Sequence, residues 1–370
     1  MTEAIESRDV DVVVIGAGQA GLSAAHHLRR LGFEPGDDVV VLDAGTRPGG
    51  AWAQRPATLT MAKVHGIFDL PGASRPESGA DADRPAADVV GDYYADYEER
   101  YGLSVRRPVR VRSVRYGHDG RLVVTSSGGT WAARAVVNAT GTWTRPYWPS
   151  YPGAAEFAGR QLHSVNYRGP DEFAGARVIV VGGGNSAAQI LSEIADVAAS
   201  TTWVTRRPPE FRDDEFTRDI GRAVVAAVDE RVRAGLPPRS VVSVTGLAYT
   251  SVVRDALEKG ALQRLPMFSR LVTGGAQWDD GSVIPADVIV WATGFRPALG
   301  HLAPLGLREP GGGIRMDGTR VVAEPRVHLV GYGPSASTVG ANRAGRAAAV
   351  EIAELLGLRQ ARSASTLAAA

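Results

Sequence analysis

The feature that most constrains the fold is a glycine-rich turn between a buried strand and a helix, which occurs twice. The first copy follows the apolar run Val12–Ile15, and its turn covers Gly16–Gly21. The second follows the run Val178–Val181, and its turn covers Gly182–Ala187. Short β-branched runs of this kind are typical of parallel strands buried on both faces. Two such units predict an α/β protein with two Rossmann-like dinucleotide-binding domains.

Each glycine of the first turn has a steric role in binding a dinucleotide. Gly16 permits the tight turn, Gly18 lets the backbone approach a pyrophosphate, and Gly21 lets the helix pack closely on the strand. The helix start then offers free N–H groups and a partial positive charge to the phosphates. After the next strand, Val39–Leu42, Asp43 is placed to accept hydrogen bonds from the ribose hydroxyls of an adenosine.

The second turn is followed by basic residues at the place where the first turn is followed by an acid. Its third glycine is replaced by Ala187, which this turn tolerates. Arg206 and Arg207 come after the next strand, where the first unit has an acid. A guanidinium binds a 2′-phosphate through two N–H donors, whereas a carboxylate repels it. The second site is therefore predicted to prefer NADPH over NADH, and the alternative is that both arginines are solvated surface charges.

Composition and net charge narrow the partners, the chemistry and the location that we expect for this protein. The net charge of +1 gives no electrostatic reason to expect a nucleic-acid partner or an anionic membrane surface. The 370 residues contain no cysteine, which excludes a disulfide framework, a thiolate nucleophile and a redox-active CxxC pair. The sequence has neither a long apolar run nor a signal-peptide pattern, so we expect a cytoplasmic protein. We expect no bound metal, and either a monomer or a homodimer.

Further segments resemble those of flavin-containing monooxygenases. Phe157–Tyr167 resembles the FxGxxxHxxx(Y/F) fingerprint of flavin-containing and N-hydroxylating monooxygenases, and Gly49–Trp52 resembles their GGxW segment. Ala139–Gly141 and Ala292–Gly294 resemble the two ATG crossings between the domains of two-dinucleotide-binding flavoproteins. Gly331–Thr338 resembles the late flavin-binding strand and helix start. The resemblance covers nearly the whole chain. It implies an FAD domain of residues 1–155 and 290–370 that is interrupted by an NADPH domain of residues 156–289.

The turns and the resemblance together predict two sets of cofactor contacts. The FAD contacts are Gly16, Gly18, Gln19, Ala20, Gly21, Asp43, Ala44, Gly50, Trp52, Val109, Ala139, Thr140, Gly141, Gly333 and Thr338. The NADPH contacts are Gly182, Gly184, Asn185, Ser186, Ala187, Arg206, Arg207, Ala292, Thr293 and Gly294.

The resemblance also implies a mechanism. NADPH reduces FAD, and the reduced flavin reacts with O₂ to a C4a-(hydro)peroxyflavin that passes one oxygen atom to a small organic substrate. The cofactor carries this chemistry, while the protein positions it and excludes water. Thr60, Lys63 and His65 are the candidates for a donor near the flavin, and the alternative for His65 is a loop histidine bonded to backbone. His163 in the fingerprint is expected to link the domains rather than to act as a base.

More than one activity is compatible with these motifs. Baeyer–Villiger enzymes end the fingerprint with Trp and then Pro or Asp, whereas this chain has Tyr167 and Arg168. This difference favours nitrogen or sulfur oxygenation over ester formation from a ketone. The motifs are also compatible with a flavin reductase or dehydrogenase that inserts no oxygen, and with a flavin-binding sensor. Substrate specificity is expected in residues 213–270, which include an amphipathic helix near Ile220–Val232. A final helix is expected over Arg343–Leu356.

Overall fold

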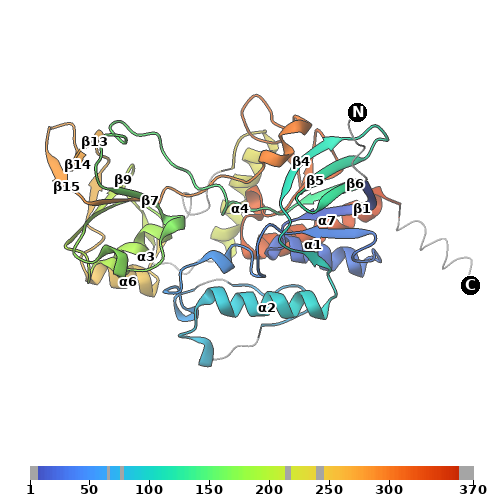
Figure 1. Ribbon diagram of the computed structural model, residues 1–370, viewed down its shortest axis with the longest axis horizontal. Coiled ribbons are helices and arrows are strands. Elements are labelled where there is room, and N and C mark those ends of the chain that lie inside the picture. Colours follow the sequence, from blue (N-terminus) through green and yellow to red (C-terminus); the bar gives the residue numbers. More distant parts are fainter. Residues whose placement is uncertain (1–6, 65–66, 76–78, 213–217, 239–245, 358–370) are drawn as a thin grey trace, which may run out of the picture.

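The computed structural model describes residues 7–64, 67–75, 79–212, 218–238 and 246–357 of the chain. Its strands form two main sheets with parallel centres, which lie on opposite sides of the molecule in Figure 1. The first sheet takes its strands from both ends of the chain, and the second takes them from the middle. This arrangement confirms the predicted α/β fold with two Rossmann-like units, one of them discontinuous.

The first sheet has the strand that precedes the first glycine turn at its centre. Its strands are β1 (Ser7–Ile15), β2 (Val39–Leu42), β3 (Val105–Arg106), β4 (Val111–Tyr116), β5 (Leu122–Ser126), β6 (Gly129–Asn138), β17 (Met316–Asp317), β18 (Arg320–Val321) and β19 (Val327–Leu329). The order is β17-β18-β19-β6-β1-β2-β3, and β4 and β5 form an antiparallel extension that pairs with β6. Because β1 pairs in parallel with both β2 and β6, its carboxyl end meets theirs at one edge.

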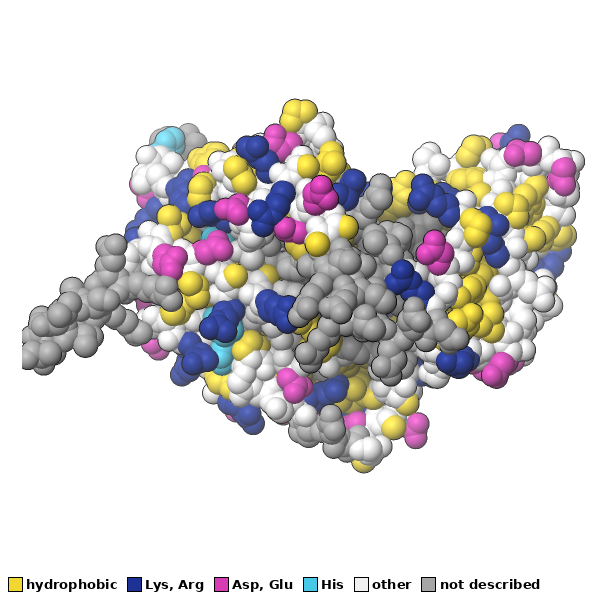
Figure 2. Space-filling model, turned by 180° about the vertical axis from the view of Figure 1, so that it is seen from behind, with side chains coloured by type: hydrophobic (Ala, Val, Ile, Leu, Met, Phe, Trp, Pro, Cys, Tyr) yellow, Lys and Arg dark blue, Asp and Glu magenta, His cyan; other side chains and the backbone are white. Residues whose placement is uncertain are grey.

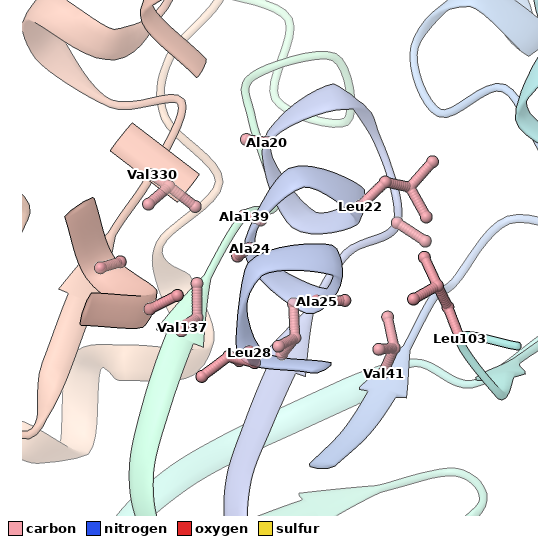
Figure 3. Close-up of a cluster of buried hydrophobic side chains, with 14 of the residues drawn as sticks. Ala20, Leu22, Ala24, Ala25, Leu28, Val41, Leu103, Val137, Ala139 and Val330 are labelled. Carbon is pink, nitrogen blue, oxygen red and sulfur yellow. The ribbon is translucent and has the colours of Figure 1, made fainter. Parts of the chain in front are cut away.

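Both faces of the first sheet are covered, which explains why the second half of its central strand, Val12–Ile15, is apolar. Val12 and Val14 point into one core, while Val13 and Ile15 point into the other, and all four are buried. Figure 3 shows side chains of the first helix packed among those of β2 and β6. The helices of this core are α1 (Gln19–Arg30), α2 (Ala86–Arg100) and α7 (Thr338–Leu355).

The second sheet is parallel throughout and is covered by different elements on its two faces. Its strands are β7 (Arg160–His163), β8 (Arg177–Val181), β9 (Ser200–Thr205), β12 (Arg264–Pro266) and β16 (Val288–Trp291), in the order β12-β9-β8-β16-β7. One face carries α3 (Asn185–Ile194) and α6 (Ser251–Glu258). The other carries the antiparallel strands β13 (Arg270–Val272), β14 (Gly275–Gln277) and β15 (Val283–Pro285). Two short strands pair separately, β10 (Phe211–Arg212) and β11 (Leu247–Ala248).

One helix of the middle segment packs against the first sheet rather than the second. It is α4 (Arg218–Arg233), which agrees with the helix expected near Ile220–Val232 and lies between the two sheets in Figure 1. Its residue Val232 is buried in the second core of the first sheet. The segment between β9 and β12 therefore connects the two units.

Short 3-10 turns complete the described elements, and the start of the last helix differs from the sequence prediction. The turns are η1 (Trp52–Gln54), η2 (Met61–Lys63), η3 (Gly79–Asp81), η4 (Ser164–Asn166), η5 (Asp171–Phe173), η6 (Gly300–Leu305) and η7 (Gly333–Ser335). The start expected for α7 at Arg343 is wrong. The helix begins at Thr338 because the Ser337 hydroxyl accepts the Gly340 N–H at 3.1 Å, an N-cap. Strand β3 ends before Pro108, which has no N–H to donate to a ladder, and β4 begins only at Val111.

The surface is of mixed charge. Figure 2 shows basic and acidic side chains interspersed over the described part of one face, as the net charge of +1 leads one to expect. In the described ranges, no helix is both long and apolar enough to cross a bilayer.

Candidate functional site

The first glycine turn lies at the carboxyl edge of the first sheet, between β1 and α1. Gly16 has φ +101°, and a Cβ there would lie 2.6 Å from the carbonyl oxygen of Ala139, which follows β6. A Cβ on Gly21 would lie 1.8 Å from the Gly16 oxygen, so both positions exclude any side chain. Gly18 differs, because a Cβ there would meet no atom closer than the Gly50 Cα at 4.0 Å. The chain itself therefore does not require glycine at position 18, whereas the close approach of a ligand would.

The second glycine turn repeats this geometry in the second sheet. Gly182 has φ +144°, and a Cβ there would lie 2.2 Å from the oxygen of Ala292, which follows β16. The two ATG segments thus occupy the same place in the two units, each beside the first glycine of its turn. α1 and α3 both begin after a glycine, Gly18 or Gly184, with no side chain capping the helix start. Free N–H groups at two helix starts fit the pyrophosphates of two dinucleotides.

Asp43 organises the first turn and retains hydrogen-bonding capacity. Its Oδ2 accepts the N–H of Ala17 at 2.7 Å, and its Oδ1 accepts the N–H of Gly45. Each carboxylate oxygen can accept a further hydrogen bond, which fits the predicted contact with ribose hydroxyls. Ala44 is exposed beside it. The N–H of Val109 already donates to the Asp43 carbonyl at 2.7 Å, so only the other atoms of Val109 are free for a ligand.

The GGxW segment lies against the first turn. Gly50 has φ +55°, and a Cβ there would lie 2.8 Å from the Gly18 Cα. Trp52 follows in η1 and packs on the core that contains α1. Ala20 is buried within that core, whereas Gln19 uses its amide in contacts between elements. Gln19 Nε2 donates to Asn342 Oδ1 at 2.9 Å and to the Phe68 carbonyl at 3.0 Å, which joins α1 to α7.

Each ATG crossing is hydrogen-bonded to the stretch of chain that follows the other crossing. The N–H of Ala298 donates to the Gly141 carbonyl and the N–H of Tyr147 donates to the Gly294 carbonyl, both at 2.9 Å. Thr140 Oγ1 donates to the Ala298 carbonyl at 2.8 Å, and Thr293 Oγ1 donates to the Tyr147 carbonyl. These hydroxyls therefore help to hold the two crossing segments together. Each crossing also abuts the first glycine of one cofactor turn, so the same segments lie beside both turns.

His163 ties the fingerprint segment to the second crossing. It is fully buried, its Nε2 lies 3.1 Å from the Gly294 carbonyl, and its Nδ1 accepts the N–H of Val165 at 3.1 Å. These partners require the neutral tautomer with the proton on Nε2. Burial lowers the pKa of His163, which favours the same neutral form. These bonds lie at the ends of β7 and β16, which are neighbours in the second sheet, so a role of His163 in linking the two domains stays a prediction.

A cation that no sequence motif indicates lies at this junction. The guanidinium of Arg55, which follows η1, sits 4.4 Å from the ring centroid of Trp143 and 5.8 Å from that of Trp52. Trp143 in turn stacks on Phe295 of the second crossing at 5.2 Å. Within the described residues the guanidinium has no hydrogen bond or ion pair, and its Nε is buried without a partner. Burial lowers the pKa of Arg55, because desolvation penalises the charged form of the guanidinium.

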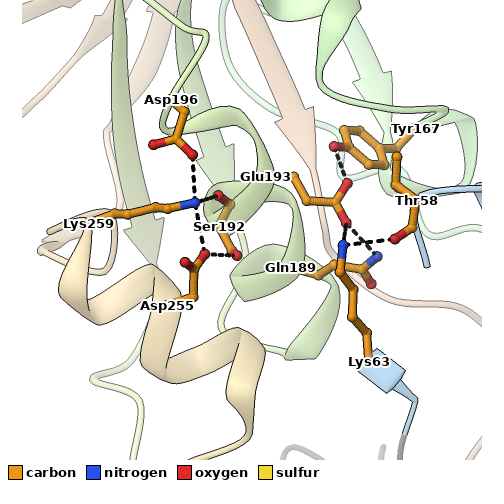
Figure 4. Close-up of polar contacts among 9 residues, drawn as sticks. All are labelled: Thr58, Lys63, Tyr167, Gln189, Ser192, Glu193, Asp196, Asp255 and Lys259. Carbon is orange, nitrogen blue, oxygen red and sulfur yellow. Dashed lines mark hydrogen bonds and ion pairs between the residues drawn. The ribbon is translucent and has the colours of Figure 1, made fainter. Parts of the chain in front are cut away.

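Two of the three candidates for a donor near the flavin lie in the described residues. Figure 4 shows Lys63 of η2 directed at α3, where its Nζ lies 3.8 Å from Glu193 Oε1. Lys63 also donates to the Thr58 carbonyl at 2.9 Å, and Tyr167 donates its hydroxyl proton to Glu193 Oε2 at 2.6 Å. The network joins the two units. Thr60 precedes η2 and is half-buried, and His65 lies outside the described residues.

The remaining predicted contacts lie at the other helix starts and after β9. Gly333, in η7, has φ +57°, and a Cβ there would lie 2.9 Å from a methyl carbon of Val232 in α4. Thr338 begins α7. Asn185, Ser186 and Ala187 form the first turn of α3. Arg206 and Arg207 follow β9 directly, are exposed, and have no ion-pair partner among the residues described.

Comparison with known proteins places this architecture among flavin- and pyridine-nucleotide-dependent enzymes. The model of the pyridine nucleotide-disulphide oxidoreductase family matches residues 13–259. A flavin-containing monooxygenase from Stenotrophomonas maltophilia is 40% identical, with a TM-score of 0.79 over 94% of this chain and 99% of that one. A ferredoxin–NADP reductase of Salinispora tropica is 32% identical over 87% of this chain and 85% of its own length. Cyclohexanone monooxygenase, at 19% identity and a TM-score of 0.64, shares the fold over 96% of this chain and 88% of its own.

Proposed function

The chain belongs to the pyridine nucleotide-disulphide oxidoreductase family and is an FAD- and NADPH-using enzyme of the flavin monooxygenase type, and we propose that it inserts one oxygen atom of O₂ into a small organic nitrogen or sulfur compound. The proposal assigns residues 1–155 and 290–370 to FAD and residues 156–289 to NADPH. When bound, FAD takes the reducing equivalents of NADPH and delivers them to O₂.

The repeated contact between a glycine turn and an ATG crossing is the observation that carries the proposal. Gly16 abuts Ala139 and Gly182 abuts Ala292, and each crossing is hydrogen-bonded to the stretch of chain that follows the other. This pattern supports two dinucleotides whose reactive ends share the junction between the sheets. A protein with a single cofactor would need only one of the two open turns.

The chain's own groups have distinct tasks in this proposal. The N–H groups at the starts of α1 and α3 bind the two pyrophosphates, and Asp43 accepts the adenosine ribose hydroxyls of FAD. Arg206 and Arg207 bind the 2′-phosphate of NADPH. Trp52, Trp143 and Phe295 cover the junction with apolar surface and exclude water from it, while the cation of Arg55 supplies a positive charge there.

Two features of the sequence narrow the reactions that we propose for this chain. The family name includes disulphide reduction, but the sequence has no cysteine, so thiol–disulphide exchange is not available to these residues. Tyr167 and Arg168 at the end of the fingerprint favour nitrogen or sulfur oxygenation over the Baeyer–Villiger reaction.

A second candidate function is supported by the relative from Salinispora tropica. That protein is a ferredoxin–NADP reductase, and the similarity extends over 87% of this chain. An NADPH-dependent reductase that passes electrons to a protein acceptor would use the same two turns without inserting oxygen.

The test scores oxygenated product and NADPH consumption together across a screen of small amines and thioethers. The monooxygenase proposal expects a substrate that gives product in proportion to the NADPH consumed. NADPH consumption that yields only reduced oxygen, together with rapid reduction of ferredoxin, would support the reductase instead.

The coenzyme assignment is tested with Arg206→Ala. Loss of a charge-assisted contact with the 2′-phosphate is expected to weaken NADPH binding by about 1–3 kcal/mol and to leave NADH binding little changed. An equal loss for both coenzymes would contradict the assignment of Arg206 to the 2′-phosphate.

A further inference from the structure

The geometry points to Arg264 as a further residue that sets the preference for NADPH over NADH: its charge lies beside the proposed 2′-phosphate site, and its hydrogen bonds to Thr205 help to hold the turn of that site. The inference rests on the proposed function, because it takes the second glycine turn as the NADPH site. Arg264 begins β12, far along the chain from Arg206, and no sequence motif indicates it.

Arg264 is bonded to the residue that immediately precedes the two exposed arginines. Its Nε donates to Thr205 Oγ1 at 2.8 Å, and one of its terminal nitrogens donates to the Thr205 carbonyl at 3.1 Å. Thr205 is buried at the end of β9. The guanidinium therefore lies at the carboxyl edge of the second sheet, the edge that bears the glycine turn.

Thr205 transmits this contact to the turn that carries the exposed arginines. Its hydroxyl accepts from Arg264 and donates its own proton to the Arg207 carbonyl at 2.7 Å. A hydroxyl has one proton to donate, so accepting from Arg264 directs that proton toward Arg207. The backbone of the Arg206–Arg207 turn is thus held in place by a chain of two hydrogen bonds that starts at Arg264.

Among the residues that the structure describes, no acidic side chain neutralises the charge of Arg264. The described residues offer it no carboxylate within ion-pair distance, and the same holds for Arg206 and Arg207. Arg206 and Arg207 follow Thr205 directly in the chain, and Arg264 is hydrogen-bonded to it, so three arginines without a described acidic partner adjoin this one residue. A 2′-phosphate carries between one and two negative charges near neutral pH and accepts several hydrogen bonds, which matches such a group.

A purely structural role for Arg264 would not need this arrangement. The backbone ladder already pairs β12 with β9, with Arg264 opposite Trp203 and Pro266 opposite Thr205. Three other arginines that join segments of this unit, Arg160, Arg177 and Arg270, are each neutralised by an acid, as Arg270 is by Glu156 at 2.7 Å. An arginine that joins two strands but keeps an uncompensated charge at the coenzyme edge is what a phosphate site requires.

The experiment measures the dissociation constants of NADP⁺ and NAD⁺ for the FAD-loaded protein by calorimetry. Arg264→Gln keeps N–H donors but removes the charge, and Thr205→Val removes the hydroxyl and keeps the charge. Arg264→Gln is expected to weaken NADP⁺ binding about tenfold or more, with NAD⁺ binding changed less than about twofold. Thr205→Val is expected to shift the same ratio by a smaller factor.

Arg270→Met is the matched control, because it removes one arginine of the same unit whose charge is already neutralised. It should leave both constants unchanged. If Arg264→Gln weakens NADP⁺ and NAD⁺ equally, or neither, the inference about Arg264 is overturned. Arg206→Ala separates failure of the proposed NADPH site from failure of the role given to Arg264. If Arg206→Ala weakens NADP⁺ and NAD⁺ binding equally, the assignment of the 2′-phosphate site is refuted. If Arg206→Ala weakens only NADP⁺ binding while Arg264→Gln does not, only the role of Arg264 is refuted.

Discussion

Replacing Arg55 by methionine is expected to stabilise the cofactor-free protein, although the change removes contacts with two tryptophan rings. The guanidinium is half-buried at the junction, has no acidic partner among the described residues, and leaves its Nε without an acceptor. Burial lowers its pKa, so the charged form is disfavoured there. Methionine has a similar length, is apolar and adapts to irregular gaps.

The magnitude follows from two opposing effects. Losing the cation–π contact at 4.4 Å from the Trp143 centroid costs about 1–2 kcal/mol. Removing a buried charge without a partner recovers several kcal/mol of desolvation free energy in fully buried cases, and less for a half-buried side chain. The net gain is about 1–3 kcal/mol, which raises the melting temperature by roughly a few degrees for a chain of this size.

Thermal unfolding followed by circular dichroism, on protein stripped of cofactors, measures this shift. Arg47→Met is the matched control from the same segment, because Arg47 is exposed and paired with Asp88 at 3.1 Å. The control should leave the melting temperature unchanged or lower it slightly. A cofactor-free Arg55→Met protein that melts below the wild type would refute the view that this cation is uncompensated.

Two further outcomes are expected. Gly182→Ala should destabilise the second unit by more than about 2 kcal/mol and abolish NADP⁺ binding, since its Cβ would lie 2.2 Å from a carbonyl oxygen at φ +144°. Gly183→Ala, whose Cβ would make an ordinary contact at 3.6 Å, should unfold at the wild-type temperature. His301 has its pKa lowered by burial to about 4, so the native state binds fewer protons than the unfolded state below about pH 6.5. The free energy of unfolding is therefore expected to fall by up to about 3 kcal/mol as the pH is lowered from about 6.5 to about 4. The melting temperature of His301→Gln should depend less on pH over this range.

The parts of the fold that the sequence predicts are those that depend on local sterics. A carbonyl oxygen of the neighbouring crossing leaves no room for a side chain at Gly16 or at Gly182. Each of these glycines also follows a short apolar run that the sequence shows directly. The apolar run Val288–Trp291 likewise coincides with one strand, β16, and all four of its residues are buried in the second sheet. Periodicity and turn chemistry suffice for such elements.

The parts that the sequence does not predict depend on contacts between distant segments. Arg55 meets Trp143, Arg264 meets Thr205, and Lys63 meets Glu193 only after the two sheets are formed. No local pattern marks an arginine that lacks an acidic partner, since the partner's absence is a property of the folded surroundings.

The start of α7 differs from the prediction for a related reason. Gly340 has a weak helix propensity, which argues for a later start. The hydrogen bond from the Gly340 N–H to the Ser337 hydroxyl outweighs that preference.

The two glycine turns are expected to bind two different dinucleotides, FAD on the first and NADPH on the second. The most direct test is anaerobic mixing of the FAD-loaded protein with NADPH, followed by the visible absorption of the flavin. We expect one NADPH to bleach each bound flavin, and NADH at the same concentration to do so much more slowly. A polypeptide that takes up no flavin, or a bound flavin that NADPH leaves oxidised, would show that the turns do not have these roles.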